Sequence, residues 1–300
     1  MNIRHFAAYL GQRFPPVNMG LFAVLFLTVW SVATFDATGQ GPAGFRWLEV
    51  GGIAATVSFF FRLRVFDEIK DYAADAVHHP QRVLQRGLVT LGQLQRLAWL
   101  GALGELAWSA QMGRAALGGW ALALGYSLLM RYEFGVSEFL KKRLVLYAFS
   151  HMLVMPLVIY WLWQACQLVQ PDWAAPPRFW LLAALSLLGG FAFELARKTH
   201  APAAEQLGID SYSRTLGYRG AIGAVLLVLV AGIVVQSVLL GQLGAGAVPF
   251  GLLAVLFGLT LLLYGRAARH PEEKLLRRAE LLVSLFILGS YLSIIVLIAL

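Results

Sequence analysis

Three aspartates recur at every fourth residue in the segment RLRVFDEIKDYAADAVHHPQRVLQRG, which covers residues 62–87. They are Asp67, Asp71 and Asp75, and this spacing places their side chains on one face of a helix. Like charges four residues apart repel by about 0.2–0.5 kcal/mol per pair, so such a helix needs a compensating cation. Mg²⁺ suits this role because it takes oxygen ligands from one or two carboxylates and shares its shell with substrate phosphates. The spacing therefore predicts a magnesium site, and pairing with neighbouring basic side chains is the alternative.

Basic and helix-breaking residues follow the aspartates. Arg82 and Arg86 lie four residues apart and could receive a phosphate between them, or could instead pair with the aspartates. Pro80 is expected to end the helix, and Gly87 to permit a turn. The segment thus combines acidic groups that suit a divalent cation with guanidinium groups that suit a phosphate.

The composition indicates an integral membrane protein. Of the 300 residues 59% are hydrophobic and only 13% are charged, which is too apolar for a soluble domain of this length. The single cysteine, Cys166, excludes an internal disulfide framework and offers no cysteine-based metal pattern. We expect membrane lipids, and no nucleic acid, among the partners of the chain.

Apolar segments long enough to cross the bilayer can be placed at about nine positions. We predict an all-α integral membrane protein with about nine transmembrane helices in a single bundle, forming one domain over residues 1–300 with a cytoplasmic lead-in over 1–16. The break between the third and fourth segments is weak, and it would leave Glu105 within a span, facing the interior. The nine segments lie near residues 17–35, 47–66, 91–110, 115–131, 144–167, 178–196, 219–240, 246–264 and 280–300.

The basic residues are distributed unequally between the two sides of these segments. Of the 24 Lys and Arg residues, all but Arg46, Arg114 and Arg178 fall on the side of the N-terminus. This excess predicts a cytoplasmic N-terminus and an outer C-terminus in the cell's inner (plasma) membrane. Nearly all acidic residues share that side, so we expect a polar cavity that faces the cytoplasm.

The segment DEIKDYAAD followed by HPQRVLQRG resembles the first signature of the UbiA superfamily of intramembrane prenyltransferases. In that family an Asn- or Asp-headed motif, NxxxDxxxD, ends the second of nine helices. Here Asp67 stands at the first position, and Val83 stands where a proline is common. The resemblance implies Mg²⁺-dependent transfer of a prenyl group from a polyprenyl diphosphate to an aromatic or lipid acceptor, whose identity no residue reveals.

The second acidic motif of that family follows the sixth span, where this chain reads FELARKTHAPAAEQLGIDSYSRTLG. The resemblance implies that Glu194 replaces the leading aspartate as a metal ligand, but Lys198 stands where a second carboxylate is expected. Arg197 and Lys198 could neutralise phosphate directly, or Glu205 and Asp210 could fold back as ligands. We favour the direct role of the two cations.

Three further residues are candidate substrate-binding groups. The ring of Tyr212 could stabilise a carbocation, although tyrosines are also common at membrane interfaces. The loop RYEFGVSEFLKKR resembles the third loop of the family, which implies that Lys142 and Arg143 reach substrate phosphates. Contact with lipid headgroups is the alternative for these two residues.

Two other functions remain open from the sequence. Some members of the family transfer a phosphoribosyl group to a polyprenyl phosphate. Because the second motif is altered here, that reaction is an alternative function for this chain. A non-enzymatic carrier of an isoprenoid or an ion is disfavoured, since carriers often contain internal repeats and no clear repeat is present. The acceptor, the length of the prenyl chain and the oligomeric state are not determined by the sequence.

Overall fold

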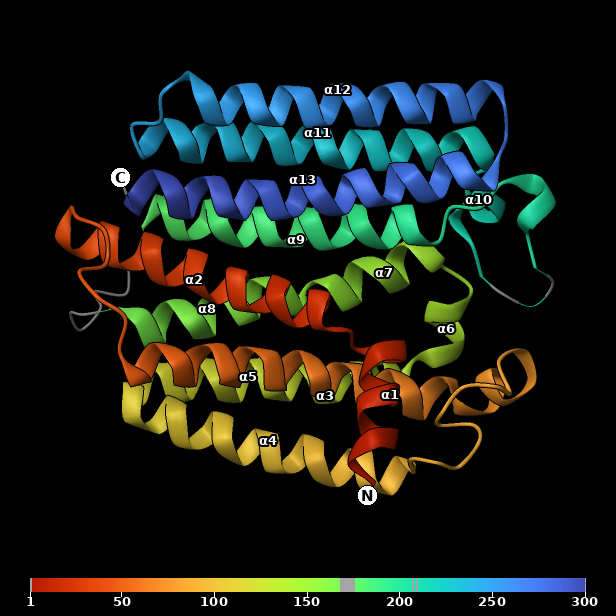
Figure 1. The fold of residues 1–300 in the computed structure, drawn as a ribbon, viewed down its shortest axis with the longest axis horizontal. Helices are drawn as coiled ribbons and strands as arrows, with labels where there is room; N and C mark the ends of the chain where they lie inside the picture. Colours follow the sequence, from red (N-terminus) through yellow and green to blue (C-terminus); the bar gives the residue numbers. More distant parts are fainter. Residues whose placement is uncertain (1, 168–175, 207, 209, 300) are drawn as a thin grey trace. The chain divides into compact units, whose positions relative to one another are not determined.

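The computed structural model describes residues 2–167, 176–206, 208 and 210–299 (Figure 1). All regular secondary structure in these residues is helical, so the predicted all-α class is confirmed. Leu300, the last residue of the ninth predicted span, lies outside the described residues.

Each predicted span coincides with a helix or, for the fifth span, with a pair of helices. The long helices within the described residues are α2 (Pro16–Thr38), α3 (Trp47–His78), α4 (Leu91–Met112), α5 (Arg114–Arg131), α9 (Pro177–Arg197), α11 (Tyr218–Gln242), α12 (Ala247–Arg269) and α13 (Glu273–Ala299). The fifth span is divided into α7 (Leu144–Met152) and α8 (Val154–Cys166). Shorter elements are α1 (Ile3–Arg13), α6 (Ser137–Lys141), α10 (Tyr212–Thr215) and single 3₁₀ turns at Glu133–Gly135 and Pro202–Ala204.

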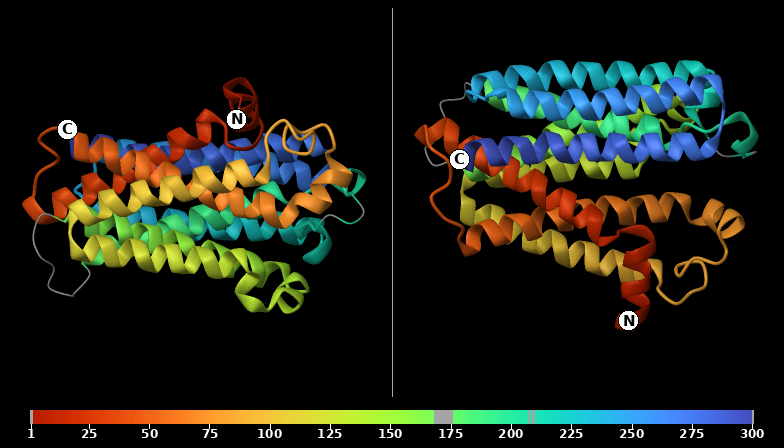
Figure 2. Two further views of the ribbon diagram at one scale, coloured as in Figure 1. Left: turned by 90° about the horizontal axis from the view of Figure 1, so that it is seen from below. Right: turned by 45° about the horizontal axis from the view of Figure 1, so that its top comes forward.

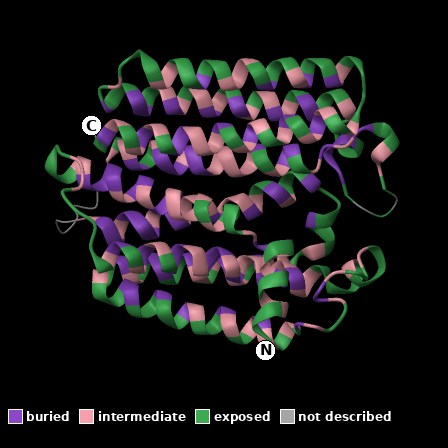
Figure 3. Ribbon diagram, viewed as in Figure 1, coloured by how far each residue is buried: buried purple, intermediate pink, exposed green. Residues whose placement is uncertain are grey.

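Six helical segments in the described part of the chain are long and apolar enough to cross a membrane. They are Pro16–Thr38, Leu144–Cys166, Pro177–Arg197, Tyr218–Gln242, Ala247–Arg269 and Glu273–Ala299. Large apolar side chains remain exposed on these helices, as on α12, where Val255 and Leu262 are 61% and 62% exposed (Figure 3). Contiguous apolar surface of this kind fits lipid rather than water. The chain is a multi-pass membrane protein.

The contacts divide the chain into two compact units. Unit 1 comprises Met1–Trp30, Pro42–Gly135 and Trp161–Cys166. Unit 2 comprises Ser31–Gly41, Val136–Tyr160 and Gln167–Leu300. The single domain over residues 1–300 stays a prediction.

In unit 1, α3 packs against α4, and α4 packs against α5. The weak break between the third and fourth spans falls at Gly113, whose φ of +111° is accessible mainly to glycine. Glu105 of α4 is fully buried and accepts bonds from Arg62 of α3 and Trp120 of α5. The prediction that Glu105 faces the interior is therefore confirmed, and its carboxylate joins all three helices.

In unit 2, α9 packs against α11 and α13, and α12 packs against α13 and α11 (Figures 1 and 2). Small residues permit close approach of these helices, as at Gly289 of α13, where an added Cβ would lie 3.2 Å from the side chain of Leu256 of α12. α10 packs against the first turns of α11 and against α7. The segment between α9 and α11 is thereby held at one end of the unit.

Candidate magnesium and diphosphate site

The aspartates lie on the last turns of α3, which is longer than a membrane span needs. Its 32 residues correspond to about 48 Å at 1.5 Å per residue, against about 30 Å of hydrocarbon. The helix ends where the backbone N–H of His79 donates to the carbonyl of Asp75 at 2.8 Å, directly before Pro80. The predicted helix end is therefore confirmed, and Asp67, Asp71 and Asp75 lie on the part of α3 beyond its apolar stretch.

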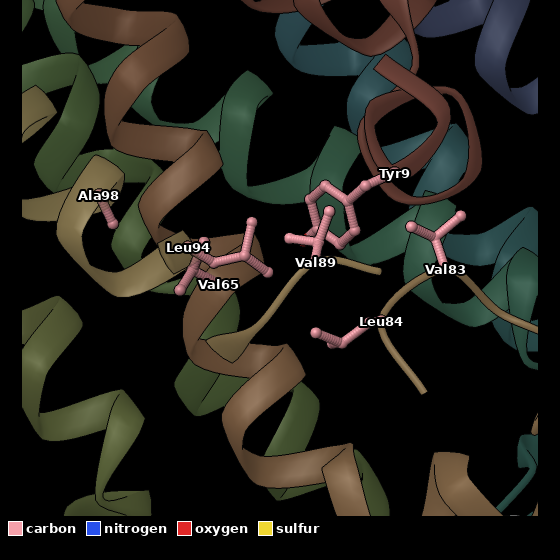
Figure 4. Packing of buried hydrophobic residues seen from close by; sticks show 7 residues of the cluster. All are labelled: Tyr9, Val65, Val83, Leu84, Val89, Leu94 and Ala98. Carbon is pink, nitrogen blue, oxygen red and sulfur yellow. The ribbon is translucent and has the colours of Figure 1, made fainter. Parts of the chain in front are cut away.

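The loop after α3 is fixed by a small apolar core. Gly87 adopts a φ of +72°, so the predicted turn is confirmed. Seven buried residues pack together and join the loop to α1, α3 and α4 (Figure 4): Tyr9, Val65, Val83, Leu84, Val89, Leu94 and Ala98. This core places Arg82 and Arg86 next to the end of α3.

The surroundings of Val83 explain why this chain has a valine where the family signature commonly has a proline. Its side chain is only 5% exposed within the core, and its backbone N–H donates to Oε1 of Gln12 at 3.0 Å. A proline has no N–H and could not make this bond. The valine therefore ties the loop to α1 in a way that the common proline would not.

Glu68, which the sequence analysis did not single out, is the most buried acid of the motif helix. Its Oε1 accepts bonds from Nε of Arg13 at 2.6 Å and from Nε of Arg64 at 2.9 Å. Burial raises the pKa of the Glu68 carboxyl, and the Arg64 guanidinium opposes that rise. The four-residue spacing of Arg64 and Glu68 was visible in the sequence, whereas the contribution of Arg13 from α1 was not.

Asp75 is engaged by guanidinium groups. Its Oδ2 lies 2.5 Å from Nη1 of Arg82 and 3.4 Å from Nη2 of Arg13. Arg82 therefore adopts the alternative role considered for it, pairing with the motif. Arg86 is exposed and forms no ion pair within the described residues, so its guanidinium is available to an anion.

Asp67 and Asp71 are less well neutralised than Asp75. Asp67 is 45% exposed, and the only ion pair that it forms within the described residues is with Nζ of Lys70, at 3.2 Å. Asp71 is exposed and forms no ion pair in the described part of the chain. Partial loss of water around Asp71 raises the pKa of its carboxyl, and the charge of Asp67 adds to that rise. Asp67 and Asp71 are thus two open carboxylates, meaning accessible and not fully neutralised by nearby cations, and they lie one helical turn apart.

The three aspartates do not gather around one point. No group of three or more His, Cys, Asp or Glu side chains in the described residues is placed to hold a metal ion together. Eight helical residues separate Asp67 from Asp75, which is about 12 Å along the helix axis, and Asp75 is also paired with Arg82 and Arg13. Asp67 and Asp71 alone fit the one or two carboxylates that a phosphate-bound Mg²⁺ commonly uses.

In unit 2, Glu194 pairs with the two cations predicted to bind phosphate. Its carboxylate lies 2.7 Å from Nη2 of Arg197 and 2.8 Å from Nζ of Lys198. The backbone N–H of Tyr212 donates to the carbonyl of Lys198 at 3.0 Å, and the side chain of Tyr212 is fully buried. Arg197, Lys198 and Tyr212 are therefore brought together at the end of α9.

Glu205 folds back, but onto its own loop. Both of its carboxylate oxygens accept from Oγ of Ser211 at 2.8 Å, and Nε of Arg214 lies 3.5 Å away. Asp210 is exposed. A metal-ligand role for Glu205 and Asp210 stays a prediction. In the structure, the hydrogen bonds of Glu205 hold its own loop together.

Lys142 and Arg143 lie between α6 and α7 in unit 2. Both are exposed, and the guanidinium of Arg143 lies 3.9 Å from the ring centroid of Phe139. Lys142 forms no ion pair within the described ranges. An exposed basic pair can contact a substrate phosphate or a lipid headgroup, and the geometry favours neither.

Comparison with known families identifies the type of enzyme. The UbiA prenyltransferase family matches residues 24–288. The chain belongs to the UbiA prenyltransferase family. It is accordingly a transferase, and the predicted resemblance and enzyme class are both confirmed.

Three solved structures share the UbiA fold with this chain. A digeranylgeranylglyceryl phosphate synthase has 13% identity, 99% coverage of both chains and a TM-score of 0.67. A UbiA homologue from Aeropyrum pernix K1 has 19% identity, 89% and 96% coverage of this and that chain, and a TM-score of 0.63. A UbiA homologue from Archaeoglobus fulgidus, bound to GPP and Mg²⁺, has 12% identity, 96% and 99% coverage, and a TM-score of 0.58. No curated protein matches the chain significantly.

Arg277 is a further residue of this UbiA-family chain that the sequence analysis left without a role. Its guanidinium donates to the carbonyls of Arg197 and Thr199 at 3.1 and 2.6 Å, and to Glu273 at 2.9 Å and Glu280. The carbonyl of Arg197, the last residue of α9, and the carbonyl of Thr199 just beyond the helix thereby gain a charged partner. No local sequence signal marks this role, because the bonded carbonyls belong to residues about 80 positions away.

Proposed function

We propose that the protein transfers a prenyl group from a polyprenyl diphosphate to an aromatic or lipid acceptor within the membrane, with Mg²⁺ as cofactor. The observation that carries this proposal is the pair Asp67 and Asp71, two open carboxylates one turn apart, of which Asp71 has no ion-pair partner in the described residues. The UbiA homologue bound to GPP and Mg²⁺ supports the same chemistry.

Asp67 and Asp71 are the residues that would hold Mg²⁺. The ion would neutralise the diphosphate as the bond from carbon to oxygen breaks. Asp75 acts differently in this proposal, because it holds Arg82 in place. A guanidinium fixed in advance stabilises the developing negative charge without reorganisation.

In unit 2, Arg197 and Lys198 are proposed to bind phosphate directly. Glu194 was predicted as a metal ligand, but we assign it to positioning these two cations, since it pairs with both. Lys142, Arg143 and Tyr212 remain candidate substrate-binding residues.

We further propose that α3, α4 and α5 also cross the bilayer, giving nine spans with a cytoplasmic N-terminus and an outer C-terminus in the inner (plasma) membrane. The distribution of Lys and Arg supports this orientation. The polar cavity predicted from the sequence would then face the cytoplasm, where the end of α3 carries its aspartates.

The test is a transfer assay on purified protein in lipid nanodiscs. Labelled geranylgeranyl diphosphate is supplied with a panel of aromatic and lipid acceptors, with Mg²⁺ or with a chelator. We expect a prenylated product only with Mg²⁺, and a loss of at least about 100-fold in Asp71→Asn, the size seen when one key electrostatic group is removed. Glu272→Gln, which changes an exposed acid outside the site, is the matched control.

The same preparation separates the proposal from its sister reaction. Labelled phosphoribosyl diphosphate is offered together with a polyprenyl phosphate under the same conditions. If the protein uses this donor and no prenyl diphosphate, its function is phosphoribosyl transfer, and the proposal of prenyl transfer is rejected.

A further inference from the structure

Arg13, the last residue of α1, contacts two acids of the motif helix with one guanidinium. Its Nε donates to Oε1 of Glu68 at 2.6 Å, and its Nη2 lies 3.4 Å from Oδ2 of Asp75. Glu68 and Asp75 are two turns apart on α3, so Arg13 spans both turns. The side chains of Arg13 and Glu68 are only 16% and 1% exposed, so water screens this contact weakly.

The rest of α1 holds Arg13 in this position. Tyr9, one turn earlier on the helix, is fully buried in the apolar core with Val83 and Leu84 (Figure 4). The side chain of Gln12 accepts a hydrogen bond from the backbone N–H of Val83 at 3.0 Å. Because α1 is fixed on both sides of the motif, the guanidinium of Arg13 is oriented before any substrate binds.

The acids of the motif are matched by an equal number of cations. Asp71 is the only one of the four acids that forms no ion pair within the described residues. Opposite charges in equal number attract a free divalent cation only weakly. Without substrate, Mg²⁺ would therefore meet little net charge and only two open carboxylates. The four acids are Asp67, Glu68, Asp71 and Asp75, and the four cations, each within 3.4 Å of one of them, are Arg13, Arg64, Lys70 and Arg82.

We propose that Arg13 makes the binding of Mg²⁺ depend on the diphosphate, because it keeps Glu68 and Asp75 paired and outside the ligand shell of the metal. The ion then needs oxygens of the diphosphate to complete its shell. Arg13 is a positioning residue, since it acts through the two acids and not on the substrate. The inference rests on the proposed function for the metal site at Asp67 and Asp71.

The test is a titration of the full-length, substrate-free protein with Mn²⁺ in a nonionic detergent, with the free ion measured by electron paramagnetic resonance. Mn²⁺ prefers the same oxygen ligands as Mg²⁺. Arg13→Gln leaves four acids facing three cations, and we expect it to bind Mn²⁺ at least about tenfold more tightly, since the affinity of carboxylate sites follows their ligand charge. Arg4→Gln removes the same charge from an exposed residue of α1 without an ion pair in the described residues, and should bind Mn²⁺ like the unmodified chain.

Two further variants separate this role from a general loosening of the site, which would weaken Mn²⁺ binding. Arg13→Gln/Glu68→Gln removes one cation and one acid, so its affinity should return close to that of the unmodified chain. Arg13→Lys replaces the guanidinium fork by a single ammonium, which can pair with Glu68 or Asp75 but not span both. Its affinity should lie between those of the unmodified chain and Arg13→Gln, and it keeps the test decisive if Arg13→Gln does not fold.

The outcomes also distinguish this inference from the proposed function. Mn²⁺ affinity that does not rise in Arg13→Gln or Arg13→Lys, or a gain that persists in the double variant, would overturn the role of Arg13, even in a protein that transfers a prenyl group. Affinities that change as expected, in a protein that transfers no prenyl group, would support the role of Arg13 and reject the proposed function.

Discussion

Arg62 and Glu105 form an ion pair inside unit 1. Nη1 of Arg62 lies 2.6 Å from both carboxylate oxygens of Glu105, and both side chains are fully shielded from solvent. Ser58 and Trp120 complete the partners of the carboxylate at 2.7 and 3.0 Å. The ion pair joins α3 to α4, and the bond from Trp120 adds α5. Arg62 precedes Asp67 by five residues, so the pair fixes α3 just before the turns that carry the aspartates.

Removal of one partner of this pair should destabilise the protein strongly. We expect Glu105→Gln to cost about 3–5 kcal/mol, because it leaves the buried charge of Arg62 uncompensated. The double variant Arg62→Met/Glu105→Met removes both charges and should lose much less. Thermal unfolding in detergent measures both effects, and a double variant as unstable as the single one would contradict this explanation.

Asp71 and Asp75 should respond differently to titration with Mg²⁺. Asp71→Asn removes an open carboxylate, and we expect the apparent Mg²⁺ requirement to rise at least about tenfold, or 1.4 kcal/mol. Asp75→Asn removes a partner of Arg82 and Arg13, so it should leave the Mg²⁺ requirement nearly unchanged and raise the KM for the diphosphate. Activity measured over a series of Mg²⁺ concentrations distinguishes the two, and identical profiles would reject separate roles.

Arg277→Gln should loosen the segment that follows α9. A charged hydrogen bond contributes about 1.5–3 kcal/mol, and the variant loses those to the carbonyls of Arg197 and Thr199. We expect faster amide hydrogen exchange over residues 197–201 and little change elsewhere. Arg278→Gln alters the exposed neighbouring arginine and is the matched control, in which exchange should stay as in the unmodified chain.

Gly52→Ala should destabilise unit 1, because a Cβ at this position of α3 would meet the rings of Phe26 and Trp108. Overpacking of a close contact costs about 1–3 kcal/mol. Gly104→Ala on α4 is the control, since nothing lies within 4 Å of the added atom, and there the better helix propensity should stabilise by up to about 1 kcal/mol. Equal melting temperatures for the two variants would contradict the packing argument.

Several features were determined by the sequence alone, because each depends on neighbours along the chain. The apolar segments match the long helices, α3 ends before Pro80, and Gly87 provides a turn with positive φ. The segment DEIKDYAAD followed by HPQRVLQRG resembles the signature of the UbiA prenyltransferases, and the match over residues 24–288 confirms that family. Helix periodicity, the conformational limits of proline and glycine, and hydropathy are local properties.

The partners of the charged groups were decided only by the tertiary structure. The sequence placed three equivalent aspartates on one face, but packing brings Arg13 from 62 residues away to Asp75 and leaves Asp71 open. It likewise brings Arg277 to carbonyls about 80 residues earlier in the chain. Spacing along a helix fixes where a carboxylate points, whereas the cation that neutralises it depends on which distant segment packs beside it, and that is set by burial of the apolar core.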